Sequence, residues 1–519
     1  RVEVEGTVSL PLAKNLPLEA VAYHYRGRIS GVESDVLVPG QQLSAAALAV
    51  EGDHKQISIS GAGSLSGIPV TAVWRQKIGK GSQPPGRVSG EAELSQAASE
   101  ALNLGLPPGT FAGAARGQFD LQLVKGGPPR LTLRSDLAGL GVRIPALGWS
   151  KPEADSGRLE LAAVLDRPAR VENLELEANG LAAQGQVLAA EGGGLERADF
   201  STVQIGSWMN GPVRLIGRQG QAPEVRVEGG IIDLRKSPFG ATGGSAGGGA
   251  GGSADSGPIR VALTRLQVTD SIALGNFRGE FSARGGFNGE FAGDLNGQTR
   301  ISGQVVTRKN GVAVRIGAND AGGVFRAAGV LRHGSGGRFE MTLLPSGTPG
   351  VFDGSLKVRD VRVKEAPSMA ALLNAVSLIG LLDELTGRGI LFSEVEAGFK
   401  LGPSYVQIEQ GSAVGPSMGL SLDGYYDTGK GVLNMRGVLS PIYLVNVVGR
   451  PLARKGEGLF GFAFELTGTS EAPQVAVNPL SALMPGVLRD IMRRKVPTAP
   501  GTEAADPPRR HVPPDSSDR

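Results

Sequence analysis

Apolar and polar residues alternate along almost the whole chain with a period of two. The pattern begins at Val2, Val4 and Val8, which are separated by polar residues, and it persists to Phe460 and Phe462 near the other end. Because successive side chains of a strand point to opposite faces, this period predicts strands with one apolar and one polar face. The chain is therefore expected to be mainly β, with a large apolar sheet face. The function of the chain depends on what covers that face.

Composition agrees with many short strands joined by tight turns. The 519 residues include 80 Gly and 33 Pro. Strand-like apolar pairs recur at intervals of roughly 10 to 15 residues, with Gly, Pro, Asn or Asp between most of them. The hydrophobic content of 40% excludes a disordered chain. These features predict a long, twisted, antiparallel sheet with a few short helices near the C-terminus.

The alternation also contains a repeat and two slips. The motif Phe277-Arg-Gly-Glu-Phe281 recurs ten residues later as Phe-Asn-Gly-Glu-Phe, which is the length of a short strand plus a turn. The apolar phase shifts by one residue between Leu263 and Leu266 and again between Val358 and Val361. Such slips predict β-bulges, which bend a sheet.

Three segments have helical rather than strand periodicity. Residues 91–104 predict a short helix that ends before Gly105. Residues 367–386 are apolar around most of the helix circumference, which predicts a buried core helix or a plug in a groove. Residues 480–494 predict a basic amphipathic helix, either a cap at the end of the sheet or a docking element for a partner.

Two low-complexity segments divide the chain. The Gly/Ser/Ala tract 241–257 predicts a flexible loop, and the Pro-rich polar segment 497–519 predicts a disordered tail. The β pattern occupies 1–240 and 258–496. Because both parts have the same rhythm, the tract is interpreted as an inserted loop rather than a domain boundary.

Catalytic motifs are weak. Gly415-Pro-Ser-Met-Gly419 matches the nucleophile elbow, but it lies between two strand patterns, and the nearest downstream histidine is His511 in the tail. The G-x-G-x-x-G match that starts at Gly247 arises because the tract is nearly all Gly. The chain has no Cys, and the other histidines (His24, His54 and His333) have no metal-ligand spacing. We therefore predict no enzyme, cofactor or metal, although two catalytic carboxylates far apart in sequence stay an alternative.

Charge and hydropathy narrow the partners. The formal net charge is +3 with interspersed charges, so a nucleic-acid partner is not predicted. No apolar run is long enough for a membrane-spanning helix. The first residue, Arg1, lies inside a strand pattern, which predicts a chain truncated or processed at its N-terminus.

The last third of the chain resembles the C-terminal domain of AsmA-like proteins. The segments that carry the resemblance are the run that starts at Leu372 (LLNAVSLIGLLDELTGRGILF), residues 414–419, residues 437–441 with Asn446, and residues 478–486. The stretch that starts at Asp136 (DLAGLGVRIPALGWSKP) resembles the YhdP-type members of alphaproteobacteria within this family, which also includes the TamB and AsmA types. The chain departs from the family pattern in lacking an N-terminal anchor and in carrying the Gly-rich insertion.

The resemblance implies a fold, a place and a function. It implies a long sheet curled into an open U-shaped groove with an apolar inside, in the periplasm of Gram-negative bacteria and anchored to the inner membrane. It also implies phospholipid transfer toward the outer membrane, which supports outer-membrane lipid homeostasis. An outer-membrane or periplasmic protein is a further expected partner, at 480–494.

The alternating pattern itself fits this function, because an apolar sheet face can hold phospholipid acyl chains. If about 30 to 35 strands stack at about 4.8 Å, such a groove is roughly 150 Å long. The residues predicted to line the groove are Val261, Leu263, Phe399, Leu401, Val406, Ile408, Leu420, Leu422, Phe460, Phe462 and Phe464. The alternatives are an outer-membrane protein assembly factor that accepts a strand, a β-solenoid or adhesin-like binding protein, and ordinary sandwich packing of these residues.

Overall fold

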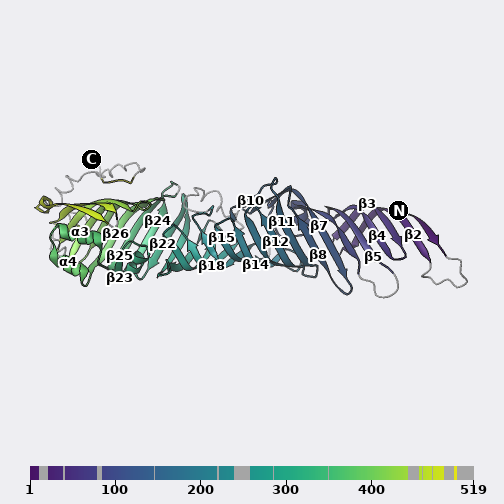
Figure 1. The fold of residues 1–519 in the computed structure, drawn as a ribbon, viewed down its shortest axis with the longest axis horizontal. Coiled ribbons are helices and arrows are strands. Elements are labelled where there is room, and N and C mark those ends of the chain that lie inside the picture. The colour runs from purple at the N-terminus through teal and green to yellow at the C-terminus, as the bar shows by residue number, and fades with distance from the viewer. Residues whose placement is uncertain are drawn as a thin grey trace, which may run out of the picture. The chain divides into compact units, whose positions relative to one another are not determined.

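The structure, a computed structural model, confirms the mainly β class. It describes residues 1–10, 21–38, 41–78, 85–144, 147–218, 221–238, 257–284, 286–348, 350–441, 455–458, 460–469, 472–483 and 496–499. Within these residues it contains 31 strands, four short α-helices and one 3-10 helix (Figure 1). The chain forms two compact units, which are described separately below.

Unit 1 comprises Arg1–Gly240, Gly247–Asp270 and Asn276–Gly289. Its strands are β1 (Val2–Ser9), β2 (Ala22–Val38), β3 (Gln41–Asp53), β4 (Gln56–Leu65), β5 (Ile68–Lys77), β6 (Arg87–Ser95), β7 (Phe111–Val124), β8 (Gly127–Ser135), β9 (Leu140–Ile144), β10 (Trp149–Lys151), β11 (Gly157–Val164), β12 (Arg170–Ala178), β13 (Leu181–Ala189), β14 (Leu195–Ile205), β15 (Met209–Arg218), β16 (Gln221–Glu228), β17 (Ile231–Asp233) and β18 (Pro258–Gln267). The strands β1 to β8 pair antiparallel in chain order, and β8, β11 and β12 to β16 continue the ladder. The short β9–β10 hairpin pairs with β7 instead.

The sheet of unit 1 is not antiparallel throughout. The strands β16 and β17 both run parallel to β18, so the prediction of a purely antiparallel sheet is wrong at this junction. Parallel neighbours cannot be joined by a tight turn and need a crossover of about a dozen residues or more. Residues 234–257 make this connection, which explains why the Gly-rich tract interrupts the strand pattern there; residues 239–256 lie outside the described part of the chain.

Unit 2 comprises Ala241–Ala246, Ser271–Gly275 and Glu290–Arg519. The division between the units falls within β19 (Ala273–Ser282) and β20 (Asn288–Leu295). The strands that follow are β21 (Thr299–Arg308), β22 (Gly311–Ala318), β23 (His333–Ser335), β24 (Arg338–Pro345), β25 (Phe352–Lys364), β26 (Ile390–Leu401), β27 (Tyr405–Val414), β28 (Met418–Asp427), β29 (Val432–Pro441), β30 (Phe462–Thr469) and β31 (Pro473–Asn478). They form an antiparallel ladder in chain order, except that β24 lies between β22 and β25, and β23 pairs with β25.

The helices differ from their predictions. The helix expected over 91–104 is shorter in the structure, where α1 covers only Gln96–Ala101. It begins later because the alternating residues before Ser95 pair with β7, and Ser95 caps the helix. The helix expected over 367–386 is broken into α3 (Pro367–Ala375) and α4 (Ile379–Thr386) at Ser377, whose φ is 57°.

Two further helices complete the set in the described residues. The helix α2 (Ala321–Ala327), which is capped by the Asp320 side chain, was not predicted. At the predicted basic helix, the structure has a 3-10 turn over Pro479–Leu483, and residues 484–495 lie outside the described residues.

The two phase slips have other causes than the predicted bulges. Val358 and Val361 are both buried, but the pairing register of β25 with β26 does not shift between them. The intervening Asp360 has a left-handed φ of 56°, which moves the alternation by one residue. Between Leu263 and Leu266, β18 keeps the same pairing register with both of its parallel partners. The irregularity lies in those partners, because β16 and β17 are separated at Gly229–Gly230.

Candidate functional site: the apolar face of unit 2

One face of the unit 2 sheet carries apolar side chains in register from strand to strand. Four rows of cross-strand partners make up this apolar face: Leu343–Gly354–Phe399–Ile408–Gly424–Met435–Leu466, Met341–Leu356–Ala397–Gly411–Leu422–Gly437–Phe464, Phe339–Val358–Val395–Ala413–Leu420–Leu439–Phe462 and Phe352–Leu401–Val406–Tyr426–Leu433. Because the side-chain period of a strand is two, antiparallel pairing in register brings the apolar positions of neighbouring strands together. The rows extend from β24 to β30.

Much of the apolar face is only half-buried. Of the predicted lining residues, Phe399, Leu401, Val406, Ile408, Leu420, Leu422 and Phe462 keep part of their surface accessible, whereas Phe464 is 3% exposed. The interior of a β-sandwich is close-packed, and its inward side chains are fully buried. The half-buried side chains therefore leave room for an apolar ligand on this face.

The remaining predicted lining residues lie elsewhere. Val261 and Leu263 belong to β18 of unit 1, where Val261 is paired with Val227 and Leu263 is 4% exposed. Phe460 precedes β30 and is 54% exposed, so the strand begins two residues later than the alternation indicated.

On β25 and β26, the opposite face of the sheet is polar and ion-paired. On β25 and β26, the Lys357 ammonium lies 2.8 Å from Glu396 and 3.4 Å from Glu394. The ammonium of Lys455, from the segment before β30, lies 2.6 Å from Glu396 and 2.7 Å from Glu394. Hydrogen bonds from Lys357 and Lys455 lower the pKa of Glu396 to about 2. The two faces of β25 and β26 thus differ sharply in polarity.

This cluster predicts a pH dependence. Because the folded-state pKa of Glu396 lies below its ordinary 4.5, its stabilising effect is present above pH 4.5 and is lost as the pH falls toward 2. Glu396→Gln should lower the unfolding free energy of unit 2 by on the order of 1 kcal/mol near neutral pH, since the group is partly screened by solvent. Denaturation at about pH 6 and about pH 3 measures the gap between wild type and variant. An equal gap at both pH values would contradict this account.

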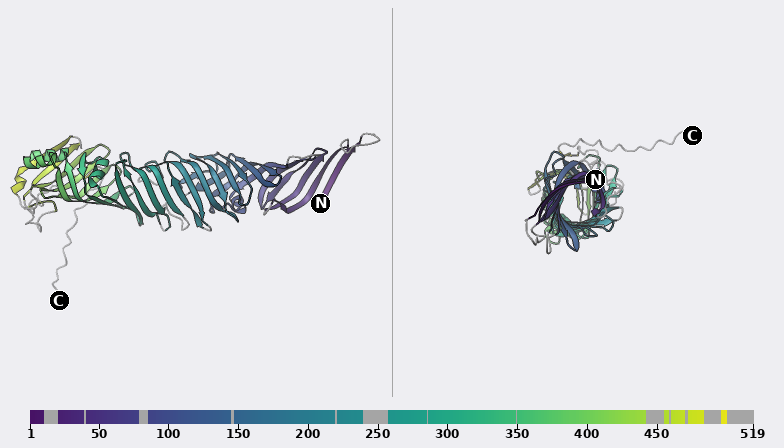
Figure 2. Two further views of the ribbon diagram at one scale, coloured as in Figure 1. Left: turned by 90° about the horizontal axis from the view of Figure 1, so that it is seen from below. Right: turned by 90° about the vertical axis from the view of Figure 1, so that its right-hand side faces the viewer.

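One end of the strands is covered by α3 and α4 (Figures 1 and 2). The helix α4 contacts β25 and β26, and α3 contacts β31. Their buried core contains Leu373, Leu385, Ile390, Phe392 and Met418, all at most 2% exposed. Because α3 directly follows β25 in the chain yet reaches the last strand of the ladder, the sheet of unit 2 must be curled between β25 and β31. The prediction of complete burial fails for Ile379, which is 70% exposed at the start of α4.

The residues that match the nucleophile-elbow motif contact the helix α4. Gly415 to Ser417 form the turn between β27 and β28, so a strand follows the serine rather than the helix that the motif requires. The Ser417 hydroxyl bonds to the Glu384 carboxylate at 3.1 Å. The motif therefore ties α4 to the sheet.

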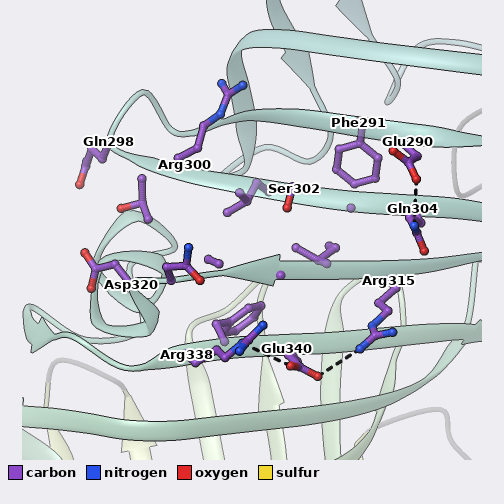
Figure 3. A pocket seen from close by; sticks show the side chains of 18 of the residues that line it. Glu290, Phe291, Gln298, Arg300, Ser302, Gln304, Arg315, Asp320, Arg338 and Glu340 are labelled. Atoms are coloured by element: carbon purple, nitrogen blue, oxygen red, sulfur yellow. Dashed lines mark hydrogen bonds and ion pairs between the residues drawn. The ribbon is translucent and has the colours of Figure 1, made fainter.

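A cavity of about 730 Å³ lies beside the apolar face, lined by residues of β20, β21, β22, β24 and α2 (Figure 3). Its cations have acidic partners: Glu340 lies 3.2 Å from Arg315 and 3.6 Å from Arg338. Its apolar lining includes Phe339, which belongs to the third row of the apolar face. The paired charges leave this cavity without a cluster of free cations to hold an anion.

One feature of the apolar face was not predicted from the sequence. Glycines stand within the rows, and Gly354 and Gly437 lie directly opposite Phe399 and Phe464. Glycine inside a strand pattern signals a close approach to the backbone, but the sequence does not say what approaches.

The described residues contain no cluster of His, Asp and Glu side chains that could hold a metal ion, and none of their helices is long and apolar enough to span a membrane. Comparison with protein-family models, with curated proteins and with solved structures gives no match. The function is therefore argued from the geometry of the apolar face.

Proposed function

We propose that this protein carries phospholipids, with their acyl chains held on the apolar face of unit 2. The observation that carries the proposal is the set of half-buried apolar side chains in register over consecutive strands, opposite a polar, ion-paired face. An acyl chain needs burial without hydrogen bonds, which is what such rows offer. The carrier has no catalytic role in this proposal.

Energetics and size support an acyl ligand. Burial of a methylene stabilises by about 0.8 kcal/mol, so exposing a chain of about 16 carbons to water costs on the order of 12 kcal/mol. A lipid that crosses water therefore needs a continuous apolar track. The rows from β24 to β30 span roughly 29 Å at about 4.8 Å per strand, whereas an acyl chain covers about half of a roughly 30 Å hydrocarbon core. The face is long enough for a whole chain.

The resemblance to AsmA-like proteins supplies the rest of the proposal. It places the carrier in the periplasm, with an inner-membrane anchor, and directs the lipid toward the outer membrane. A protein partner at 480–494 belongs to the same proposal. Assembly of outer-membrane proteins is the competing function, in which the groove accepts a strand instead of a lipid.

Native mass spectrometry with lipid extraction tests the ligand. Wild-type protein should co-purify with diacyl lipid, and Phe462→Asp should lose most of it, because a carboxylate in the third row adds the cost of burying a charge. Thr467→Asp is the matched control, since Thr467 lies on the same strand, five residues away and therefore on the opposite face. Lipid-free wild-type protein that takes up no lipid from vesicles would contradict the proposal and favour the assembly function.

A further inference from the structure

Two aromatic rings of the apolar face lie against glycines of the neighbouring strand. Gly354 on β25 is the direct cross-strand partner of Phe399, and Gly437 on β29 is the partner of Phe464. A Cβ added at Gly354 would overlap the ring of Phe399, to which the three nearest atoms belong. A Cβ at Gly437 would lie 2.9 Å from Cζ of Phe464, and it would lie closer still to the backbone oxygen of Ser421. The Phe399 ring thus lies over Gly354, whereas Gly437 is constrained by the backbone of β28 as well as by a ring.

The same arrangement occurs in unit 1. Tyr25 on β2 is the direct partner of Gly52 on β3, and the three atoms nearest to a Cβ at Gly52 all belong to the tyrosine side chain. Glycine in a strand interior costs about 0.5–1 kcal/mol relative to alanine, so its repeated place beneath a ring needs a reason. Covering an exposed glycine with an aromatic ring is a known means of stabilising a sheet.

Gly354 supplies space rather than backbone freedom. Its φ is not in the left-handed region, so an alanine could adopt the same backbone conformation. Side chains of a strand ordinarily stand roughly perpendicular to the sheet, whereas a ring that overlies the Cα of the next strand lies down on it. With a methyl group at Gly354, the Phe399 ring would have to leave this position.

We propose that Gly354 keeps the lipid track open, because it lets the Phe399 ring lie flat on the sheet. The Gly354–Phe399 pair then determines the thickness of the acyl chain that fits on the first row. This inference rests on the proposed lipid-carrying function and specifies its ligand. The ligand is an unbranched acyl chain, which can pass over a ring that lies flat on the sheet. Gly354 acts through Phe399 and is a positioning residue. In Gly354→Ala the ring stands up between Leu343 and Ile408 and obstructs the row.

The chain offers a matched control in the neighbouring strand. Gly398 precedes Phe399, and a Cβ added there would meet nothing within 4 Å. Gly398→Ala therefore makes the same chemical change one residue from the same ring without displacing it. Phe399→Leu in the Gly354→Ala background removes the obstructing ring and should restore the track.

The experiment measures transfer of a fluorescent diacyl phosphatidylethanolamine from donor to acceptor vesicles by the full chain. Gly354→Ala should slow transfer about tenfold or more, the scale expected from overpacking a filled site. Gly398→Ala should stay within about twofold of wild type, and the Gly354→Ala/Phe399→Leu double variant should recover. Recovery distinguishes an obstructing ring from general damage to the fold.

Three outcomes would overturn the inference. Wild-type speed in Gly354→Ala would show that the ring finds another place, and failure of the double variant to recover would assign the loss to the fold. Both leave the lipid-carrying function intact, because wild type still transfers lipid. A wild type that transfers no lipid would overturn the proposed function and this inference together.

Discussion

Lys151→Met should destabilise unit 1 by about 3–5 kcal/mol, the cost of removing one partner from a buried charged network. Lys151 is only 1% exposed, at the end of β10. Its ammonium donates to the backbone oxygens of Leu137 and Leu140, each at 2.8 Å, and of Pro152 at 3.1 Å. Methionine has a similar length but no donor, so the two buried carbonyls of Leu137 and Leu140 would lose their partner, at about 1–3 kcal/mol for each unsatisfied group, as would the part-buried carbonyl of Pro152.

The consequence should be local detachment of the β9–β10 hairpin. Beyond Lys151, the hairpin is held by hydrogen bonds from Trp149 to the Asn179 carbonyl (3.0 Å) and from the Asn179 amide to Ser150 (2.6 Å). Hydrogen exchange at the β9 amides measures this opening directly, which matters because a chain of two units need not unfold in one step. Lys125→Met, in the exposed turn between β7 and β8, is the control. Unchanged protection in Lys151→Met would contradict the structural role.

Leu356→Asp should abolish most lipid transfer, whereas Ser355→Asp should leave it near the wild-type rate. The two residues are neighbours on β25, and the two variants add the same charge on opposite faces. Leu356 lies in the second row, between Met341 and Ala397, and Ser355 is exposed. A carboxylate in the track must either be buried without a partner or hold water where an acyl chain would lie, and both are costly.

Vesicle-to-vesicle transfer measures this difference, with thermal unfolding as a check that both variants fold. The structure predicts a loss of about a hundredfold for Leu356→Asp, since burying an unpaired polar group costs at least a few kcal/mol. Equal loss in both variants would mean that charge on β25 acts through the fold. Equal retention would mean that lipid does not travel along the second row.

The class of fold follows from the sequence because a period of two has one structural meaning over so long a chain. The pairs Val406/Ile408 and Leu420/Leu422 fall on strands and on one face, as the alternation indicates. Local pattern is less informative where tertiary context competes with it. The helix expected over 91–104 covered Glu91 to Leu94, yet these residues belong to β6, because they pair with β7.

Three features could not be derived from pattern alone. The parallel pairing of β16 and β17 with β18 depends on which edge the chain meets after residues 234–257, and nothing local specifies this. The break between α3 and α4 depends on a left-handed Ser377, a conformation that serine seldom adopts. The role of Lys151 depends on three backbone carbonyls that converge on its ammonium group, and the sequence does not show which residues supply them.

The most direct test of the acyl-chain track is site-specific photo-crosslinking on both faces of the same strands. A photoreactive amino acid would replace Leu343 or Met435 on the apolar face, and Thr342 or Asn434, their neighbours on the opposite face. With diacyl lipid bound, the account predicts lipid adducts at Leu343 and Met435 and none at Thr342 and Asn434. Adducts of equal yield on both faces, or none on either, would contradict it.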